Sequence, residues 1–516
     1  MLPDDPDPRT SSLGFATLGE LRQLLSKDLT RAELVETLLG RIARLDRAGP
    51  QLRSVLAVDG RAAERAEAAE AAEAAAPGLA ARPLLGVPVL VKDNLDTAGG
   101  LGTTAGSLAL AEVPPARDAT AVARLREAGA VVLGKTNLSE WANFRSRRSS
   151  SGWSAVGGQT RNPHALDRSP GGSSSGSGAA VAAGFAPLAV GTETDGSILC
   201  PAAVCGVVGV KPTRGLVSRA GVVPIAASQD SVGPMARSVV DAALLLGVLA
   251  GADLADPATL ERPAGLPAEY TQFCRAGGLE GMRVGVPRAF YTGYHPAADR
   301  VVAEALRAMH EAGATLIDPV EVPTAAELDE SEDELTVFFH EFHDGLDRYL
   351  AGRPGDRDAC PRSLAELIAF NEANAGEELA LFGQDLFEAA AATEGLDAPG
   401  YRQALERNLR RAGRDGLDAA LDGAGLDALV VLTMAPAWCI DQVNGDPSLR
   451  AGYQAAAVAG YPSISLPVGS VDGLPVGLTF LGRAWSEPTL LRLASALEHQ
   501  LDLTLLASFR PSVALR

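Results

Sequence analysis

The chain has 516 residues, 47% of them hydrophobic, and a formal net charge of −19 at pH 7. This length and hydrophobic fraction suffice for a large folded core and exclude a chain that is disordered throughout. The acidic charge argues against nucleic acid or an anionic membrane surface as a partner, because both are bound through basic patches. The net charge gives no information about a small substrate.

Three further features bear on the compartment. The first residues, MLPDDPDPRTSS, are acidic and proline-rich and lack the basic and apolar regions of a signal peptide. The longest apolar stretches, such as residues 178–191, are short and broken by glycine and proline, so none is expected to span a membrane. The five cysteines are scattered and form no C-x-x-C motif, which is typical of reduced thiols. We therefore predict a cytoplasmic protein.

The N-terminal part is predicted to be helical. Residues 17–46 carry apolar side chains at helical spacing. Residues 61–76, RAAERAEAAEAAEAAA, are strong helix formers that end at a Pro-Gly pair. We expect a helical segment over residues 15–77 at the periphery of the molecule.

From residue 84 onward, short apolar runs alternate with helical segments. LLGVPVLVKDN and AVVLGKTN suit buried strands, and a helix is expected between them at about residues 119–128. Further runs of the same kind are APLAVGTE, MRVGVP, ATLIDP, LDALVVLT and LPVGLTFLG. The pattern predicts an α/β fold with a large mixed, mostly parallel β-sheet core covered by helices on both faces.

Residues 320–425 are helical and rich in charge, and we interpret them as an insertion packed over the sheet. No internal repeat is found, and no linker is long enough to demand separate domains. We therefore predict one domain over residues 1–516. It would comprise the helical N-terminal segment, a core over about residues 80–250 and the helical insertion.

Two loops rich in glycine and serine lie beside regular elements. Residues 169–180, SPGGSSSGSGAA, open an alanine-rich helix, and residues 191–197, GTETDGS, follow a predicted strand. Neither loop carries the Gly-Lys-Ser/Thr of a phosphate-binding loop or a G-x-G-x-x-G motif, so nucleotide binding is disfavoured. Ser197 could act as a nucleophile. Only His164 of the six histidines precedes it, so its base need not be histidine.

A metal site is the next alternative. His340 and His343 are three residues apart, which differs from the H-E-x-x-H spacing of a zinc site, and no third ligand is evident. Glu193 and Asp195 could suggest metal ligands or a glycosidase pair, but as close neighbours in a turn they do not flank one bond. We expect neither a metal nor another cofactor.

The segments GVPVLVKDN, SPGGSSSGSGAAVAAG and GTETDGSILCPAAVCGVVGVKPTRGLVS, in this order, resemble the amidase signature family. The resemblance covers about residues 15–500. Within the family, NLSEWANFRSRRSSSGWSAVGGQTRNP and AAVAGYPSISLPVG are similar to the peptide amidases. The mark of the family is a Ser–cis-Ser–Lys triad. Carried over to this sequence, it implies Ser197 as the nucleophile, Ser173 as the bridging serine and Lys92 as the base.

Lysine can act as a base only when it is neutral. Its reference pKa is about 10.4, so a pKa near 7 requires the ammonium form to be destabilised by roughly 4.6 kcal/mol. The apolar run before Lys92 offers the burial that would do this. Because an inward-facing carboxylate at Asp93 would oppose the shift, we expect the Asp93 side chain to point away from Lys92.

Attack on an amide creates an oxyanion, which backbone N–H groups in a tight turn can stabilise. The expected donors are Thr194, Asp195, Gly196 and Ser197, with the glycine allowing close approach. Residues 144–153, FRSRRSSSGW, are expected to line the leaving-group side. Within them Ser149 is either a substrate contact or a simple turn cap.

The resemblance implies an amide hydrolase that forms an acyl-enzyme and releases ammonia from C-terminal peptide or amino-acid carboxamides. Two alternatives within the family remain open: the glutaminase-type subunit of a tRNA-dependent amidotransferase, and an amidase for small aliphatic or aryl amides. A binding protein without activity is a third. Cys200 stands where many members carry arginine, which argues against small acid amides. The expected partner is a small-molecule or peptide amide, and the expected state is a monomer or homodimer.

Overall fold

The structure is a computed structural model, which describes residues 13–25, 27–75, 82–355, 359–447 and 450–513. Its centre is an eleven-stranded sheet in the order β1-β3-β2-β6-β8-β7-β12-β13-β11-β9-β10. The strands are β1 (Val55–Val58), β2 (Pro88–Lys92), β3 (Val131–Thr136), β6 (Leu188–Glu193), β7 (Val208–Lys211), β8 (Ser231–Ala236), β9 (Arg283–Pro287), β10 (Thr315–Val320), β11 (Ala428–Leu432), β12 (Ser463–Val471) and β13 (Leu474–Leu481). A separate small ribbon pairs β4 (Trp153–Ser154) with β5 (Gly158–Gln159).

The large mixed sheet of an α/β fold is confirmed, and its parallel and antiparallel strand pairs lie in separate parts of the sheet. Parallel pairs form β3-β2-β6 at one side and β11-β9-β10 at the other. The strands between them pair antiparallel. The middle is therefore more mixed than the alternation of strands and helices predicts. One reason is the two-residue turn at Asp472 and Gly473, both with positive φ, which returns β13 directly beside β12.

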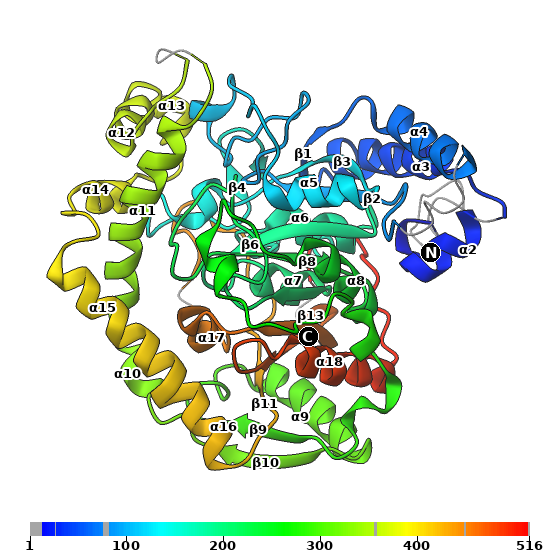
Figure 1. The fold of residues 1–516 in the computed structure, drawn as a ribbon, viewed down its shortest axis with the longest axis vertical. Coiled ribbons are helices and arrows are strands. Elements are labelled where there is room, and N and C mark those ends of the chain that lie inside the picture. Colours follow the sequence, from blue (N-terminus) through cyan, green and yellow to red (C-terminus); the bar gives the residue numbers. More distant parts are fainter. Residues whose placement is uncertain (1–12, 26, 76–81, 356–358, 448–449, 514–516) are drawn as a thin grey trace.

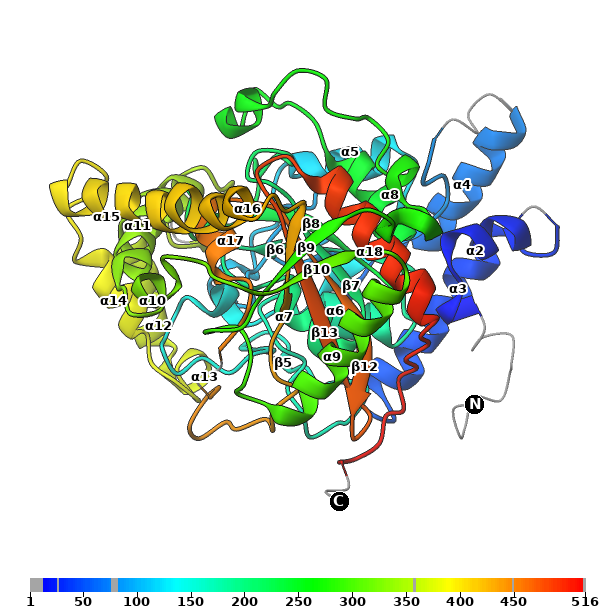
Figure 2. The same ribbon diagram turned by 90° about the horizontal axis from the view of Figure 1, so that it is seen from below.

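Helices cover both faces of the sheet, as expected, and the chain path explains why. The crossover from β2 to β3 through α5 (Thr120–Glu127) runs in the opposite direction along the sheet from the crossover from β3 to β6 through α6 (Ser175–Ala182). Because crossovers between parallel strands are right-handed in nearly all proteins, these two directions place the two helices on opposite faces. Figure 2 shows α8 (Val239–Leu249) and α18 (Glu487–Leu501) with α5, whereas α7 (Leu199–Cys205) lies with α6. The helix α9 (Pro296–Glu311) also packs against β12.

The N-terminal helices lie together at one side of the molecule (Figure 1), and the Leu18 N–H of the first of them donates to the Asp241 carboxylate of α8. They are α2 (Leu18–Leu25), α3 (Arg31–Ile42) with a π-helical turn at Ala43–Arg47, and α4 (Ala62–Ala75). The predicted helix over residues 17–46 is thus two helices. Thr30 starts the second one, because its hydroxyl accepts a hydrogen bond from the Glu33 N–H while the Glu33 carboxylate accepts from the Thr30 N–H.

The region predicted as an insertion is helical and lies along one side of the molecule (Figure 1). Its helices are α10 (Ala325–Asp329), α11 (Asp333–Ala351), α12 (Leu364–Ala373), α13 (Ala375–Glu378), α14 (Asp385–Ala391), α15 (Pro399–Leu409) and α16 (Ala419–Gly423), with a π-helical stretch at Arg410–Asp418. Phe342 of α11 is fully buried, with its ring centroid 4.8 Å from that of Phe144 and 5.3 Å from that of Phe387. These rings join the insertion to the loop that follows β3.

A buried ionic contact joins the same parts. Arg145 lies 3.1 Å from the Glu140 carboxylate, donates to the backbone carbonyl of Glu378, and stacks over the ring of Phe382. The Glu378 carboxylate in turn accepts from the Ser107 hydroxyl at 2.9 Å. We call this group of five residues the Arg145 clamp. It holds α13 against the loops beside β2 and β3.

None of the helices in the described ranges combines the length and the apolar character that crossing a lipid bilayer requires.

We expect Phe342→Ala to lower the free energy of unfolding by about 3–5 kcal/mol, because it leaves a cavity among packed aromatic rings. Urea unfolding measures the change. Phe290→Ala is the matched control, since that ring is 37% exposed and should cost about 1 kcal/mol or less. Equal losses in the two variants would contradict the role given to Phe342.

Candidate active site

The residues of the predicted triad come from three segments that meet at one edge of the sheet. β2 and β6 are adjacent and parallel, so their last residues, Lys92 and Glu193, reach the same edge. Ser197 follows β6 through the 194–197 turn. Ser173 lies in the loop before α6. The C-terminal edge of these strands therefore collects all three side chains.

Lys92 is fully buried and contacts Ser173 directly. Its Nζ lies 2.8 Å from Ser173 Oγ, 2.8 Å from Thr192 Oγ1 and 3.2 Å from the Thr192 carbonyl oxygen. Burial lowers the pKa of Lys92 from its ordinary value to about 7, and the nearby carboxylates of Glu193 and Asp230 oppose this shift. The amine can thus be neutral near neutral pH while it contacts a serine hydroxyl.

Asp93 turns away from Lys92, as expected. Its carboxylate accepts from the Thr104 hydroxyl and lies 3.5 Å from Nζ of Lys135 on β3. The Lys135 amine also donates to the Leu95 carbonyl at 2.6 Å. This second buried lysine therefore balances the carboxylate that follows Lys92 in the chain.

The peptide bond between Gly172 and Ser173 is cis. Gly172 is enclosed, because a Cβ atom there would collide with Ser139 Oγ and lie 2.8 Å from Ser151 Oγ. Gly171 has a φ of +68° and faces the thiol of Cys200 in the same way. Only glycine fits before Ser173 without displacing its neighbours.

Ser174 connects the Ser173 loop to the Ser197 turn. Its N–H donates to the Ser197 carbonyl at 3.0 Å, and its hydroxyl donates to the Thr192 carbonyl at 3.1 Å. Glu193 fixes the other side of the turn, since its carboxylate accepts from the N–H groups of Ile198 at 2.7 Å and Leu199 at 2.9 Å. Ser197 is 7% exposed. The two serines are thus held by neighbouring, hydrogen-bonded loops.

The 194–197 turn is tight around Gly196. Gly196 has a φ of +75°, and a Cβ atom there would collide with the ring of Tyr453. No described residue accepts a hydrogen bond from the backbone N–H groups of Thr194, Asp195 or Ser197. The Thr194 hydroxyl donates to Asp230 at 2.6 Å.

The Asp195 side chain faces a second acid. Its Oδ1 is buried and has no hydrogen-bond partner among the described residues. Burial and the nearby Glu334 carboxylate of α11 hold the pKa of Asp195 well above its usual range. Glu334 itself accepts from the side-chain amides of Gln229 at 2.8 Å and Gln454 at 3.1 Å. The insertion therefore contributes a side chain beside the turn, which the sequence did not indicate.

Ser149 and its loop lie beside the Ser173 loop. The Ser149 hydroxyl donates to the Ser146 carbonyl at 2.8 Å, which is the turn-capping contact that the sequence left as one alternative. Asn143 was not predicted. Its Nδ2 lies 3.1 Å from where a Cβ of Gly172 would be, and its Oδ1 is buried without a partner among the described residues. Asn143 thus offers a free acceptor beside the cis peptide.

The two histidines considered for a metal site have separate partners. His340 Nδ1 lies 2.8 Å from the Gly395 carbonyl oxygen, and His343 Nδ1 lies 3.1 Å from Thr393 Oγ1. Within the described part of the chain, no group of three or more His, Cys, Asp and Glu side chains could hold a metal ion.

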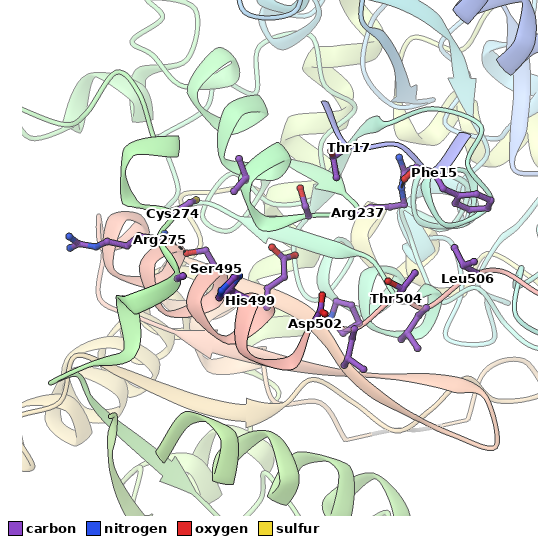
Figure 3. A pocket seen from close by; sticks show the side chains of 18 residues that line it. Phe15, Thr17, Arg237, Cys274, Arg275, Ser495, His499, Asp502, Thr504 and Leu506 are labelled. Carbon is purple, nitrogen blue, oxygen red and sulfur yellow. Dashed lines mark hydrogen bonds between the residues drawn. The ribbon is translucent and has the colours of Figure 1, made fainter. Parts of the chain in front are cut away.

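A cavity of about 460 Å³ lies at the opposite edge of the sheet. Figure 3 shows Ser495, His499 and Asp502 on one side of it and Thr17 and Arg237 on the other. Arg237 follows the far end of β8, away from the edge that carries Lys92. This cavity is therefore separate from the site built around Lys92.

Comparison with known proteins identifies the family of the chain. The model of the Amidase family matches residues 33–491. A probable amidase of Arabidopsis thaliana is 38% identical over 95% of this chain and 90% of its own length. A glutamyl-tRNA(Gln) amidotransferase subunit of Roseiflexus castenholzii is 37% identical over 94% of this chain and 96% of its own length. The chain belongs to the amidase family, as its motifs predicted.

Among solved structures, native peptide amidase from Stenotrophomonas maltophilia matches with a TM-score of 0.89 and 47% identity. The match covers 97% of this chain and 99% of that one. The fold is thus that of an amidase, and the protein is an amide-hydrolysing enzyme.

Burial of a neutral lysine should make stability depend on pH. The folded-state pKa of Lys92 is about 7 and the unfolded one about 10.4, so between these values the unfolded chain binds more protons. The cost of burying Lys92 therefore becomes smaller, and the free energy of unfolding rises, as the pH increases between these two values. Lys92→Met should stabilise the protein at pH 7.5, and the gain should shrink by about 2 kcal/mol at pH 9.5.

Chemical denaturation at the two pH values measures this difference. Lys27→Met, at an exposed lysine, serves as the control and should show no such change. A gain for Lys92→Met that is independent of pH would mean that the buried amine is not neutral.

Proposed function

We propose that the enzyme hydrolyses C-terminal carboxamides of peptides or amino acids through Ser197, Ser173 and Lys92. The observation that carries this proposal is the contact of 2.8 Å between a buried amine with a pKa near 7 and the Ser173 hydroxyl. A neutral lysine can accept a proton at neutral pH, which a solvated lysine cannot.

In the proposed first step, Ser197 Oγ attacks the carbonyl carbon of the amide. Its proton passes to Ser173 Oγ, whose own proton passes to Lys92 Nζ. The oxyanion is stabilised by backbone N–H groups of the 194–197 turn, of which those of Thr194, Asp195 and Ser197 have no acceptor among the described residues. When the carbon–nitrogen bond breaks, the protons return by the same route to the leaving nitrogen, and ammonia departs.

In the proposed second step, water attacks the acyl-enzyme. Lys92 takes a proton from the water by way of Ser173 and returns it to Ser197, and the carboxylic acid leaves. No group outside this chain and water is needed to balance the reaction. The free oxygen of Asn143, beside the cis peptide, suits an N–H of the substrate carboxamide, and Ser149 supports the same loop.

The substrate class is supported by likeness to peptide amidase at 47% identity over nearly the whole of both chains. Cys200 gives independent support against a small acid amide. It is buried, and its thiol packs against Gly171 in the position where the family pattern often has arginine. No guanidinium is thus offered there to a substrate carboxylate.

A glutaminase-type subunit is the second candidate, favoured by the 37% identity to an amidotransferase subunit over 94% of this chain. The name of that relative implies a multisubunit enzyme that acts on a glutamyl-tRNA. The two proposals differ in their preferred amide and in the need for a partner.

Ser197→Ala, Ser173→Ala and Lys92→Ala should each lower kcat for ammonia release by at least about a thousandfold, since each removes a step of proton transfer or attack. Ser218→Ala, at a buried serine bonded to Asp253, is the control and should stay within a few-fold of wild type. The wild-type rate should rise with pH through about 7 as Lys92 loses its proton. A wild-type rate for Ser197→Ala would exclude the mechanism.

A substrate panel separates the functions. We expect kcat/KM for an N-acetylated dipeptide carboxamide to exceed that for glutamine, propionamide and benzamide by at least about tenfold, because an extended substrate makes more contacts in the transition state. Ammonia release is followed with wild type and with Ser197→Ala as background. Preference for glutamine would instead support the amidotransferase function.

A further inference from the structure

We propose that Asp230 is a positioning residue of the proposed site: it holds the turn that carries Thr194 and supplies a negative charge at the edge of the sheet where Lys92 lies. This inference rests on the proposed function. Asp230 was not indicated by any motif, and its segment is distant in sequence from Lys92 and Ser173.

The geometry places Asp230 at the same sheet edge as the triad. It directly precedes β8, whose first residue, Ser231, pairs with Glu193 at the end of β6. One carboxylate oxygen accepts from the Thr194 hydroxyl at 2.6 Å. The other accepts from the N–H groups of Ile225 at 2.9 Å and Ala226 at 3.1 Å. The carboxylate therefore joins the loop before β8 to the 194–197 turn.

The same carboxylate acts on Lys92 through space. Burial depresses the pKa of the lysine, and the charges of Glu193 and Asp230 raise it, which leaves it at about 7. Burial raises the pKa of Asp230 itself to about 6, so Asp230 is ionised in the range in which Lys92 titrates. A base whose pKa lies near the working pH is the most effective one. The two acids thus keep a buried lysine from becoming too weak a base.

Other charges near these groups have partners of their own. Arg219 faces Asp230, but its guanidinium is held by Asp256 at 2.7 Å. Lys211, at the end of β7, lowers the pKa of Glu193. Asp93, which follows β2, is matched by Lys135 on β3. The charge of Asp230 can consequently be removed by a single substitution without leaving one of these ions unpaired.

Asp230→Asn tests the charge with little change of shape. An asparagine can accept from both backbone N–H groups through its oxygen and donate to Thr194 through its nitrogen. Loss of the negative charge should move the low-pH limb of kcat/KM for the dipeptide carboxamide to lower pH, by about 0.5–1 unit. The plateau rate should fall a few-fold because the lysine becomes a weaker base.

Asp46→Asn is the matched control. Asp46 is also a buried aspartate that accepts from one hydroxyl, of Ser54, and from two backbone N–H groups, of Ser54 and Val55. It lies outside the proposed site, so its substitution should leave the low-pH limb unchanged.

Thr194→Val separates the two roles of Asp230, because it breaks the hydrogen bond and keeps the charge. It should lower the plateau at least about threefold without moving the limb.

An unchanged limb in Asp230→Asn, a limb moved to higher pH, or an equal shift in Asp46→Asn would overturn the inference. If Asp230→Asn does not fold, the low-pH limb is measured with Asp230→Ser, since this substitution also removes the charge. Activity retained in Ser197→Ala or Lys92→Ala would defeat the proposed function instead. If Ser197→Ala and Lys92→Ala lose activity but the low-pH limb of Asp230→Asn does not move to lower pH, the proposed function stands and only the inference about Asp230 fails.

Discussion

The fully buried amine of Lys92, 2.8 Å from the Ser173 hydroxyl, is the interaction on which the rest of the site depends. A buried cation is costly, so the amine tends to lose its proton and becomes able to accept another. The sheet makes this possible, because β2 lies between β3 and β6 and is covered on both faces. An amine at the end of such a strand is removed from water while its tip still meets the loops at the sheet edge.

The surrounding charges show how closely that burial is balanced. Two acids raise the proton affinity of Lys92, and one neighbouring acid is paired with a lysine of its own. Such an arrangement lowers the stability of the folded chain, as is common where a functional group is held in an unfavourable environment. The compensation lies elsewhere, in the continuous apolar core that surrounds the sheet.

Much of the fold and of the proposed triad could be predicted from the sequence. Lys92 ends an apolar strand, and Ser173 and Ser197 lie in glycine-rich loops, so local pattern and family motif together pointed to the residues of the proposed triad. Asp230 and Glu334 could not be found this way, because they meet the turn only through the packing of β8 and α11. The antiparallel middle of the sheet was also missed, since strand alternation does not reveal which neighbour a strand pairs with.

The Arg145 clamp has a consequence for anyone who wishes to exchange the insertion between relatives. Because α11 reaches the 194–197 turn through Glu334, the insertion is an attractive module for transplanting substrate preference. The insertion is held in place, however, by the fully buried ion pair of Arg145 and Glu140. Both residues precede the insertion in the chain, so an exchange of the insertion alone would not carry them along. A chimera that moves Glu378 and Phe382 without Glu140 and Arg145 would leave a buried charge without the neighbours that enclose it, so donor and acceptor segments need to travel together.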